Sequence, residues 1–319
     1  MDIFYFVAQQ IMFFMIPLII VALGGLFSEK SGVVNIALEG KMLMGAFTGI
    51  LFISRMQQAE VMSGQGLLVV ALVIASLAGA LLSLLHAYAS ITLKANQIIS
   101  GVAINMFAPA FAIYTSRFLH GTQNIHFTNQ FRIERVPGLG SIPLLGPMLF
   151  QNTFITTFLG FVILLVSSFV LYKTKFGLRL RACGEHPGAA DSVGINVTHM
   201  RYAGVILSGA LAGLGGLVFI IPITPVFTGT VSGYGFLALA VLIFGGWNPK
   251  KILLAALFFG LMQTIAASYS AIPVLLNLGI PAHFYRMFPF IATLIILSFT
   301  SKNTAAPKAL GQVYDKGGR

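Results

Sequence analysis

The chain has 319 residues, of which 57% are hydrophobic and only 8% are charged, and its mean hydropathy is +0.91. A soluble domain carries roughly 25% charged residues, so this composition excludes a soluble globular protein and indicates an integral membrane protein. The formal net charge of +11 does not indicate nucleic-acid binding here, because basic residues gather in the cytoplasmic loops of membrane proteins.

Seven apolar runs are long enough to span a membrane, which takes about 20 mostly apolar residues. They lie near residues 3–27, 67–93, 98–116, 153–172, 202–221, 252–269 and 285–300. Two shorter or interrupted runs lie near 33–53 and 230–247. We therefore expect an all-α polytopic membrane protein, a bundle of about eight to ten transmembrane helices with broken or re-entrant segments. Residues 1–300 are expected to form a single transmembrane domain.

The basic residues predict the orientation. They favour the cytoplasm, which places the loop 173–201 and the basic tail 301–319 inside and the loop 117–152 outside. The outside loop is rich in proline and glycine and should be turn-rich, and the short polar tail is expected to be disordered. Counting helices puts the N-terminus outside, but a re-entrant segment near 28–45 would reverse that. The first apolar run reads as a retained helix, not as a cleaved signal.

Small residues recur at four-residue spacing in two of the apolar runs. The pairs are Ala75 with Gly79 and Gly209 with Gly213. Such pairs let helix backbones approach closely in lipid, so the bundle should be compact.

The segment SEKSGVVNIALEGKMLMGAF at 28–47 contains polar groups followed by a purely apolar stretch. If residues 33–47 are helical, Asn35 and Glu39 lie one turn apart on one face. Such groups are costly in lipid and usually face the protein interior or a water-filled path. The alternative is a polar cap at the cytoplasmic end of a helix. In that alternative three charged side chains lie in solvent: Glu29, Lys30 and Lys41.

In the segment LKANQIISGVAINMFA at 93–108, Gln97, Gly101 and Asn105 fall on one helical face. Two amides that flank a glycine can hydrogen-bond a polar solute close to the backbone. The alternative is that these amides tie membrane helices together, and the sequence leaves both open.

The segment PITPVFTGTVSGYG at 222–235 contains prolines and glycines that forbid a continuous helix. Irregular backbone must line a cavity or lie outside the membrane. Phe227 and Tyr234 can offer ring faces to a planar ligand, while an ordinary external loop is the alternative. The interrupted segments at 28–53 and 225–250 hold comparable places in two halves of the chain, as broken helices along a transport path often do.

The stretch KTKFGLRLRACGEHPGAADSVGINVTHMRY at 173–202 is a basic, polar island. Pro187 suits the first turn of a helix and Gly194 suits the position just past its end, which predicts a helix of roughly two turns at 187–193. A helix so short is marginal alone in water. It should be held by packing outside the membrane, which indicates a cytoplasmic partner.

Motifs of catalysis and metal binding are absent from the sequence. It contains no HExxH, CxxC, GxxxxGK[ST] or GxSxG, and its six histidines are not at metal-ligand spacing. The single cysteine, Cys183, reads as an incidental small residue. We expect no catalytic residue, no metal and no cofactor bound by this chain.

The loop GLRLRACGEHPGAADSVGIN at 177–196 resembles the coupling loop of membrane permeases from bacterial ATP-binding-cassette importers. The family is the one that serves branched-chain amino acids, simple sugars and nucleosides. In it, an Ala-Ala pair (here Ala189 and Ala190) and a following glycine (here Gly194) build the helix that enters a groove on the ATPase. The motif SGVVNIALEG and the segment ANQIISGVAIN are similar to the nucleoside branch.

This resemblance implies a bacterial cell-membrane importer in which the chain is one permease half. Its partners would be a second related permease in a heterodimer, a cytoplasmic ATPase that uses ATP and Mg, an extracytoplasmic substrate-binding lipoprotein and membrane lipids. Four side chains are expected to make polar contacts with the ATPase: Arg179, Arg181, Glu185 and Asp191. For Arg179, a role in topology and lipid-headgroup contact is the alternative.

Two other functions compete with nucleoside import. Related permeases carry simple sugars or riboflavin, and these solutes would use the same amides and rings. A different class is an ion-coupled secondary transporter, which keeps ionisable residues in mid-membrane. Glu39 is the one acidic residue expected within the bilayer, and this scarcity argues against ion coupling.

Overall fold

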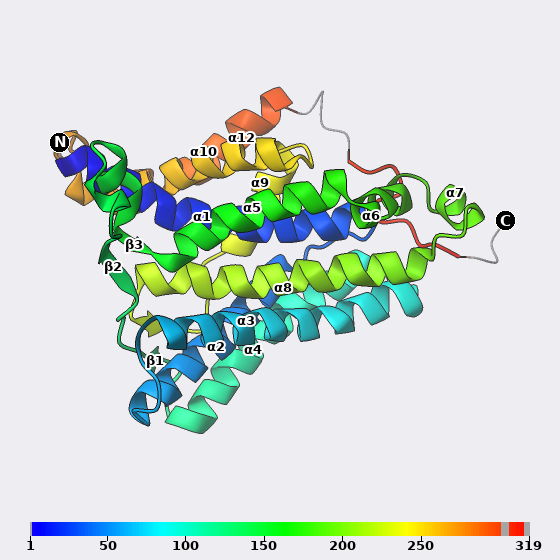
Figure 1. Ribbon diagram of the computed structural model, residues 1–319, viewed down its shortest axis with the longest axis horizontal. Helices are drawn as coiled ribbons and strands as arrows, with labels where there is room; N and C mark the ends of the chain where they lie inside the picture. Colours follow the sequence, from blue (N-terminus) through cyan, green and yellow to red (C-terminus); the bar gives the residue numbers. More distant parts are fainter. Residues whose placement is uncertain (1, 301–305, 316–319) are drawn as a thin grey trace.

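The computed structural model describes residues 2–300 and 306–315, and over this part of the chain it is a helical bundle (Figure 1). The long helices are α1 (Asp2–Lys30), α2 (Leu38–Gln58), α3 (Gly64–Ala87), α4 (Gln97–His120), α5 (Ile155–Lys173), α8 (Val197–Ile223), α10 (Pro249–Ser268) and α12 (Ala282–Thr300). The shorter ones are α6 (Lys175–Glu185), α7 (Pro187–Ser192), α9 (Tyr234–Phe244) and α11 (Pro273–Leu276).

Six helical stretches in the described ranges are long and apolar enough to cross a membrane. They cover residues 3–30, 64–92, 97–120, 155–173, 197–223 and 249–271. Helices α2, α9 and α12 occupy the three other predicted runs. The all-α polytopic fold class is therefore confirmed, and α9, with 11 residues, is one of the expected broken elements.

Helices α1 and α8 form the centre of the bundle. The side chains from Leu18 to Leu23 of α1 are fully buried, and α8 packs against α1, α2 and α3. The predicted close approach of backbones is confirmed between α3 and α8. A Cβ added to Gly213 would clash with the carbonyl oxygen of Ala75 and the backbone of Gly79, so no larger residue fits there without moving a helix.

The start of α1 and the described tail residues lie at opposite ends of the bundle (Figure 1). The N-terminus lies beside the segment 121–154, whereas α6 and α7 lie at the other end with the tail. The N-terminus thus shares its side with the loop 117–152, as helix counting predicted, and the assignment of that side to the outside stays a prediction. The segment between α4 and α5 forms two small antiparallel pairings: β1 (Ile125–His126) with β4 (Val226–Phe227), and β2 (Arg132–Arg135) with β3 (Gln151–Phe154).

Two expectations about the cytoplasmic side are corrected. Most of the supposed loop after α5 is the helix α6, whose buried Leu180 and Cys183 pack against the bundle. The expected disorder of the tail is wrong for residues 306–315, since Ala309 is only 3% exposed and hydrogen-bonds to α6. The rest of the predicted tail, 301–305 and 316–319, lies outside the described residues.

Candidate functional site

The segment between α1 and α2 is not helical, so Asn35 and Glu39 do not share a helix face. Helix α1 ends at Lys30, Gly32 follows with φ of +94°, and α2 begins only at Leu38. Glycine is favoured just past a helix end because it adopts positive φ without strain. Gly32 therefore explains the end of α1, and the condition that residues 33–47 are helical is not met.

The interrupted segment is held from inside by a buried polar cluster. Asn35 is fully buried, donates from Nδ2 to Ser208 Oγ, and accepts at Oδ1 from Lys41 Nζ at 2.7 Å. The Lys41 side chain is also fully buried, and Glu29, 4% exposed, accepts a hydrogen bond from Trp247 Nε1. The alternative that placed Glu29 and Lys41 in solvent is therefore wrong.

Glu39 joins the two interrupted segments to each other. Its Oε1 accepts from Gly233 N at 2.9 Å, and its Oε2 accepts from Gly235 N at 2.6 Å. These amides form the N-terminus of α9, which has no side-chain cap of its own. A carboxylate is favoured there by the helix dipole and by the unpaired amides of the first turn. The interrupted segment before α9 is thus stabilised by Glu39, a residue of the interrupted segment at 28–53.

The amides of α4 bond to the same interrupted segment. Gln97 Oε1 accepts from Val34 N at 2.8 Å, and Asn105 accepts from Gly40 N at 2.8 Å while donating to Ile36 O at 2.9 Å. The expected common face of α4 is confirmed. The hydrogen bonds of Gln97 and Asn105 favour the alternative in which these amides tie the membrane segments together. We call residues 31–41, with the side chains on α4 and α8 and the backbone amides at the start of α9 that bond to them, the polar joint.

Two predicted pathway residues keep a polar atom unused. Gln97 Nε2 and Tyr234 Oη are buried and have no hydrogen-bond partner among the residues that the structure describes. Buried polar groups are paired in most proteins, so each exception calls for an explanation. The rings of Phe227 and Tyr234 are also buried, and Tyr234 stacks on Phe219 at 3.9 Å between ring centres. A solute would have to displace these ring contacts.

The predicted short helix on the cytoplasmic side is present as α7. Pro187 is its first residue, His186 Nδ1 accepts from Ala189 N, and Gly194 beyond its end has φ of +82°. Pro187 and Gly194 therefore predicted both ends of α7 correctly. At the end opposite the N-terminus, α7 stands out from the bundle (Figure 1).

The side chains of the α6–α7 region divide into two groups. Ala190 is 3% exposed and belongs to the chain's own core. Cys183 belongs to the same core, and its burial raises the pKa of its thiol. Arg181 is partly buried and its guanidinium lies 4.9 Å from the centre of the Tyr172 ring. Four of the expected contact residues are exposed: Arg179, Glu185, Ala189 and Gly194.

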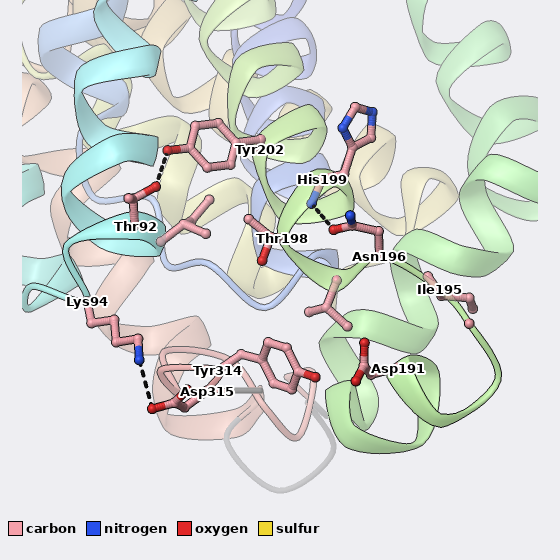
Figure 2. A pocket seen from close by; sticks show the side chains of 13 residues that line it. Thr92, Lys94, Asp191, Ile195, Asn196, Thr198, His199, Tyr202, Tyr314 and Asp315 are labelled. Atoms are coloured by element: carbon pink, nitrogen blue, oxygen red, sulfur yellow. Dashed lines mark hydrogen bonds and ion pairs between the residues drawn. The ribbon is translucent and has the colours of Figure 1, made fainter. Parts of the chain in front are cut away.

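Asp191 of α7 is half-buried and faces Tyr314 of the tail (Figure 2). One side of α7 therefore packs against the bundle, whereas its other side is exposed. No cluster of three or more His, Cys, Asp or Glu side chains suited to a metal ion occurs in the described ranges.

Comparison with known proteins agrees with this architecture. Residues 7–297 match the family of the branched-chain amino acid transport system, permease component. The guanosine ABC transporter permease NupQ of Bacillus subtilis is 46% identical over 95% of this chain and 94% of its own length. The nucleoside ABC transporter permease NupC of Lactococcus lactis is 39% identical over 97% and 96%. A second nucleoside permease of that organism, NupB, is 26% identical over 94% and 83%.

No solved structure matches the chain. The matched residues run from α1 into α12 and include both the polar joint and α7. The resemblance seen in the coupling loop and in SGVVNIALEG is thereby confirmed, and the chain, a multi-pass membrane protein, belongs to the branched-chain amino acid transport system permease family.

Proposed function

We propose that this chain is one permease half of an ATP-driven nucleoside importer of the bacterial cell membrane. The observation that carries the proposal is the 46% and 39% identity, over nearly the whole chain, to a guanosine and a nucleoside permease. Guanosine is therefore the first solute to test.

The seating of α7 supports a separate ATPase as the source of energy. Ala190 anchors the helix to the bundle, while Ala189 and the 75%-exposed Val193 present an uncovered side. A helix of six residues cannot be stable by itself, and an exposed apolar residue at its end suits a groove on a partner. ATP and Mg would be bound by that partner and not by this chain.

The second permease of the importer is proposed to be a related chain and not a copy. Lactococcus lactis has two relatives of this chain, NupC and NupB, and both are named as nucleoside permeases. Two such halves would form the pathway, with a binding lipoprotein on the N-terminal side. Closure of the ATPase would push α7 and shift the bundle between two states.

The solute pathway is proposed to pass the polar joint. Six residues were assigned to it: Asn35, Glu39, Gln97, Asn105, Phe227 and Tyr234. Their geometry supports two different roles. Asn35, Glu39 and Asn105 have hydrogen-bond partners within the chain and would shape the interrupted segments. Gln97 Nε2 and Tyr234 Oη are buried without a partner in the described ranges and would meet a solute once the ring contacts open.

Reconstitution of the full complex tests the proposal. The two permeases, the ATPase and the binding protein are placed in proteoliposomes, and ATPase stimulation is measured with guanosine, other nucleosides, riboflavin and simple sugars. Stimulation by nucleosides alone is expected. Stimulation by a sugar or by riboflavin would rule out nucleosides as the solute but leave the ATP-driven importer in place. Uptake driven by an ion gradient without ATP would overturn the proposal altogether.

A further inference from the structure

Residues 306–315, which we call the strap, cross the face of the protein that carries α7. Ala309 N donates to Gly184 O at the end of α6, and Gly311 N donates to Gly32 O in the turn after α1, at 2.9 and 3.0 Å. Ala309 itself is buried. The first half of the strap is therefore attached through backbone bonds to two separate elements.

A buried arginine adds a third firm attachment. Arg201 of α8 is 2% exposed, and its Nη1 donates to Gln312 O at 2.9 Å. A hydrogen bond from a charged group contributes more than a neutral one. The middle of the strap is thus fixed to α8, the helix that follows α7.

Asp315, the last described residue of the strap, is attached more weakly than Tyr314, whose ring also lies 6.0 Å from the Arg201 guanidinium. The Tyr314 hydroxyl points at the Asp191 carboxylate of α7, and Asp315 Oδ2 lies 2.7 Å from Lys94 Nζ in the connection between α3 and α4 (Figure 2). The Lys94 and Asp315 side chains are 45% and 56% exposed. Exposed ion pairs contribute little to stability, so this contact can open and close at little cost.

A cavity of about 760 Å³ separates the two elements that the strap end reaches. One wall is the α7–α8 junction, including Asp191 and Asn196, and the other is the α3–α4 connection, including Thr92 and Lys94. Figure 2 shows two bridges across it, a hydrogen bond between Tyr202 and Thr92 and the strap end with Tyr314 and Asp315. The strap end is therefore one of the contacts that connect α7 with the chain just before α4.

We propose that Tyr314 and Asp315 are positioning residues that transmit the movement of α7 to α4. The firm middle keeps the strap in place, while its weak end links Asp191 on the helix that moves to Lys94 at the start of α4. Helix α4 in turn holds the polar joint through Asn105. This inference rests on the proposed docking of an ATPase on α7 and assigns the next link of that coupling.

Charge reversal of the ion pair tests the role in coupling. In the reconstituted complex, guanosine uptake per ATP hydrolysed is measured for Asp315→Lys, Lys94→Asp and the double variant, together with Tyr314→Phe. Each single change is expected to lower the ratio about two- to fivefold, the effect of losing roughly 0.5–1 kcal/mol. The double reversal should restore it. The unfolding midpoint in detergent should change little, because the firm attachments remain.

Val313→Ala is the matched control, since Val313 lies on the strap and is 49% exposed. It should leave the ratio at the wild-type value. Wild-type ratios in all the single variants, or no rescue by the double reversal, would overturn the role of the strap. A wild-type complex without nucleoside-stimulated ATPase would instead overturn the proposed function, so the two failures are distinguishable.

Discussion

The polar joint and the α7 region contain similar side chains in opposite circumstances. In the joint, Asn35, Glu39 and Lys41 all bond to other parts of the chain, deep in an apolar bundle. In the α7 region, Arg179 and Glu185 are exposed. Polar groups in lipid must find partners within the protein, whereas polar groups at the water-facing end are available to another protein. The same residue types therefore hold the fold together in one place and offer contacts in the other.

Glu39→Ala should break the joint most severely. It removes two charge-assisted hydrogen bonds, each worth about 1.5–3 kcal/mol, and leaves the amides of Gly233 and Gly235 unpaired. We expect the free energy of unfolding to fall by about 3 kcal/mol or more, measured as thermal unfolding in detergent. Glu39→Gln should be milder, since it retains one acceptor oxygen. A stable Glu39→Ala protein would show that α9 does not depend on this cap.

Asn105→Leu should weaken the joint less. It leaves Gly40 N and Ile36 O without their partner, and hydrogen bonds between membrane helices contribute about 1–2 kcal/mol at most. We expect a lower unfolding midpoint together with slower guanosine uptake. If uptake kinetics fall while the unfolding midpoint stays at the wild-type value, Asn105 contacts the solute directly and the tying role is wrong.

A pair of neighbouring substitutions should separate the two faces of α7. Ala189 is exposed and Ala190 is 3% exposed. Ala189→Glu should change stability by no more than about 0.5 kcal/mol, as surface substitutions do, yet lower uptake and copurification of the ATPase. Ala190→Glu buries a charge and should destabilise the seat of α7 before it affects docking. Equal ATPase binding by Ala189→Glu and wild type would contradict the docking role of the exposed face.

Tyr234→Phe should have the smallest effect on stability. The hydroxyl has no partner in the described chain, so its removal should leave the protein as stable or raise stability by about 1 kcal/mol. If Tyr234 meets the solute, the KM for guanosine should rise while the ATPase remains coupled. An unchanged KM would remove Tyr234 from the pathway and leave Gln97 to be tested in the same way.

The sequence predicted the positions of the helices well, but it predicted poorly which side chains bond to one another. Nine apolar runs, the paired small residues at Gly79 and Gly213, and the ends of α7 were all foreseen, because each depends on local composition or on residues a few positions apart. The helix α6 was missed because its many basic residues hid an apolar face with Leu180 and Cys183. Asn35 and Glu39 would share a face only if residues 33–47 were helical, whereas α2 begins at Leu38.

The sequence by itself determined that this protein is a multi-pass membrane bundle with two interrupted helices and a short cytoplasmic helix. Hydrophobic length, proline and glycine act locally, and a linear sequence displays them. Only the tertiary structure decided which polar groups are bonded and which are free. Glu39 meets amides 194 and 196 positions away, and Arg201 meets the strap 111 positions away. Such pairings depend on how the helices pack, and no spacing along the chain contains them.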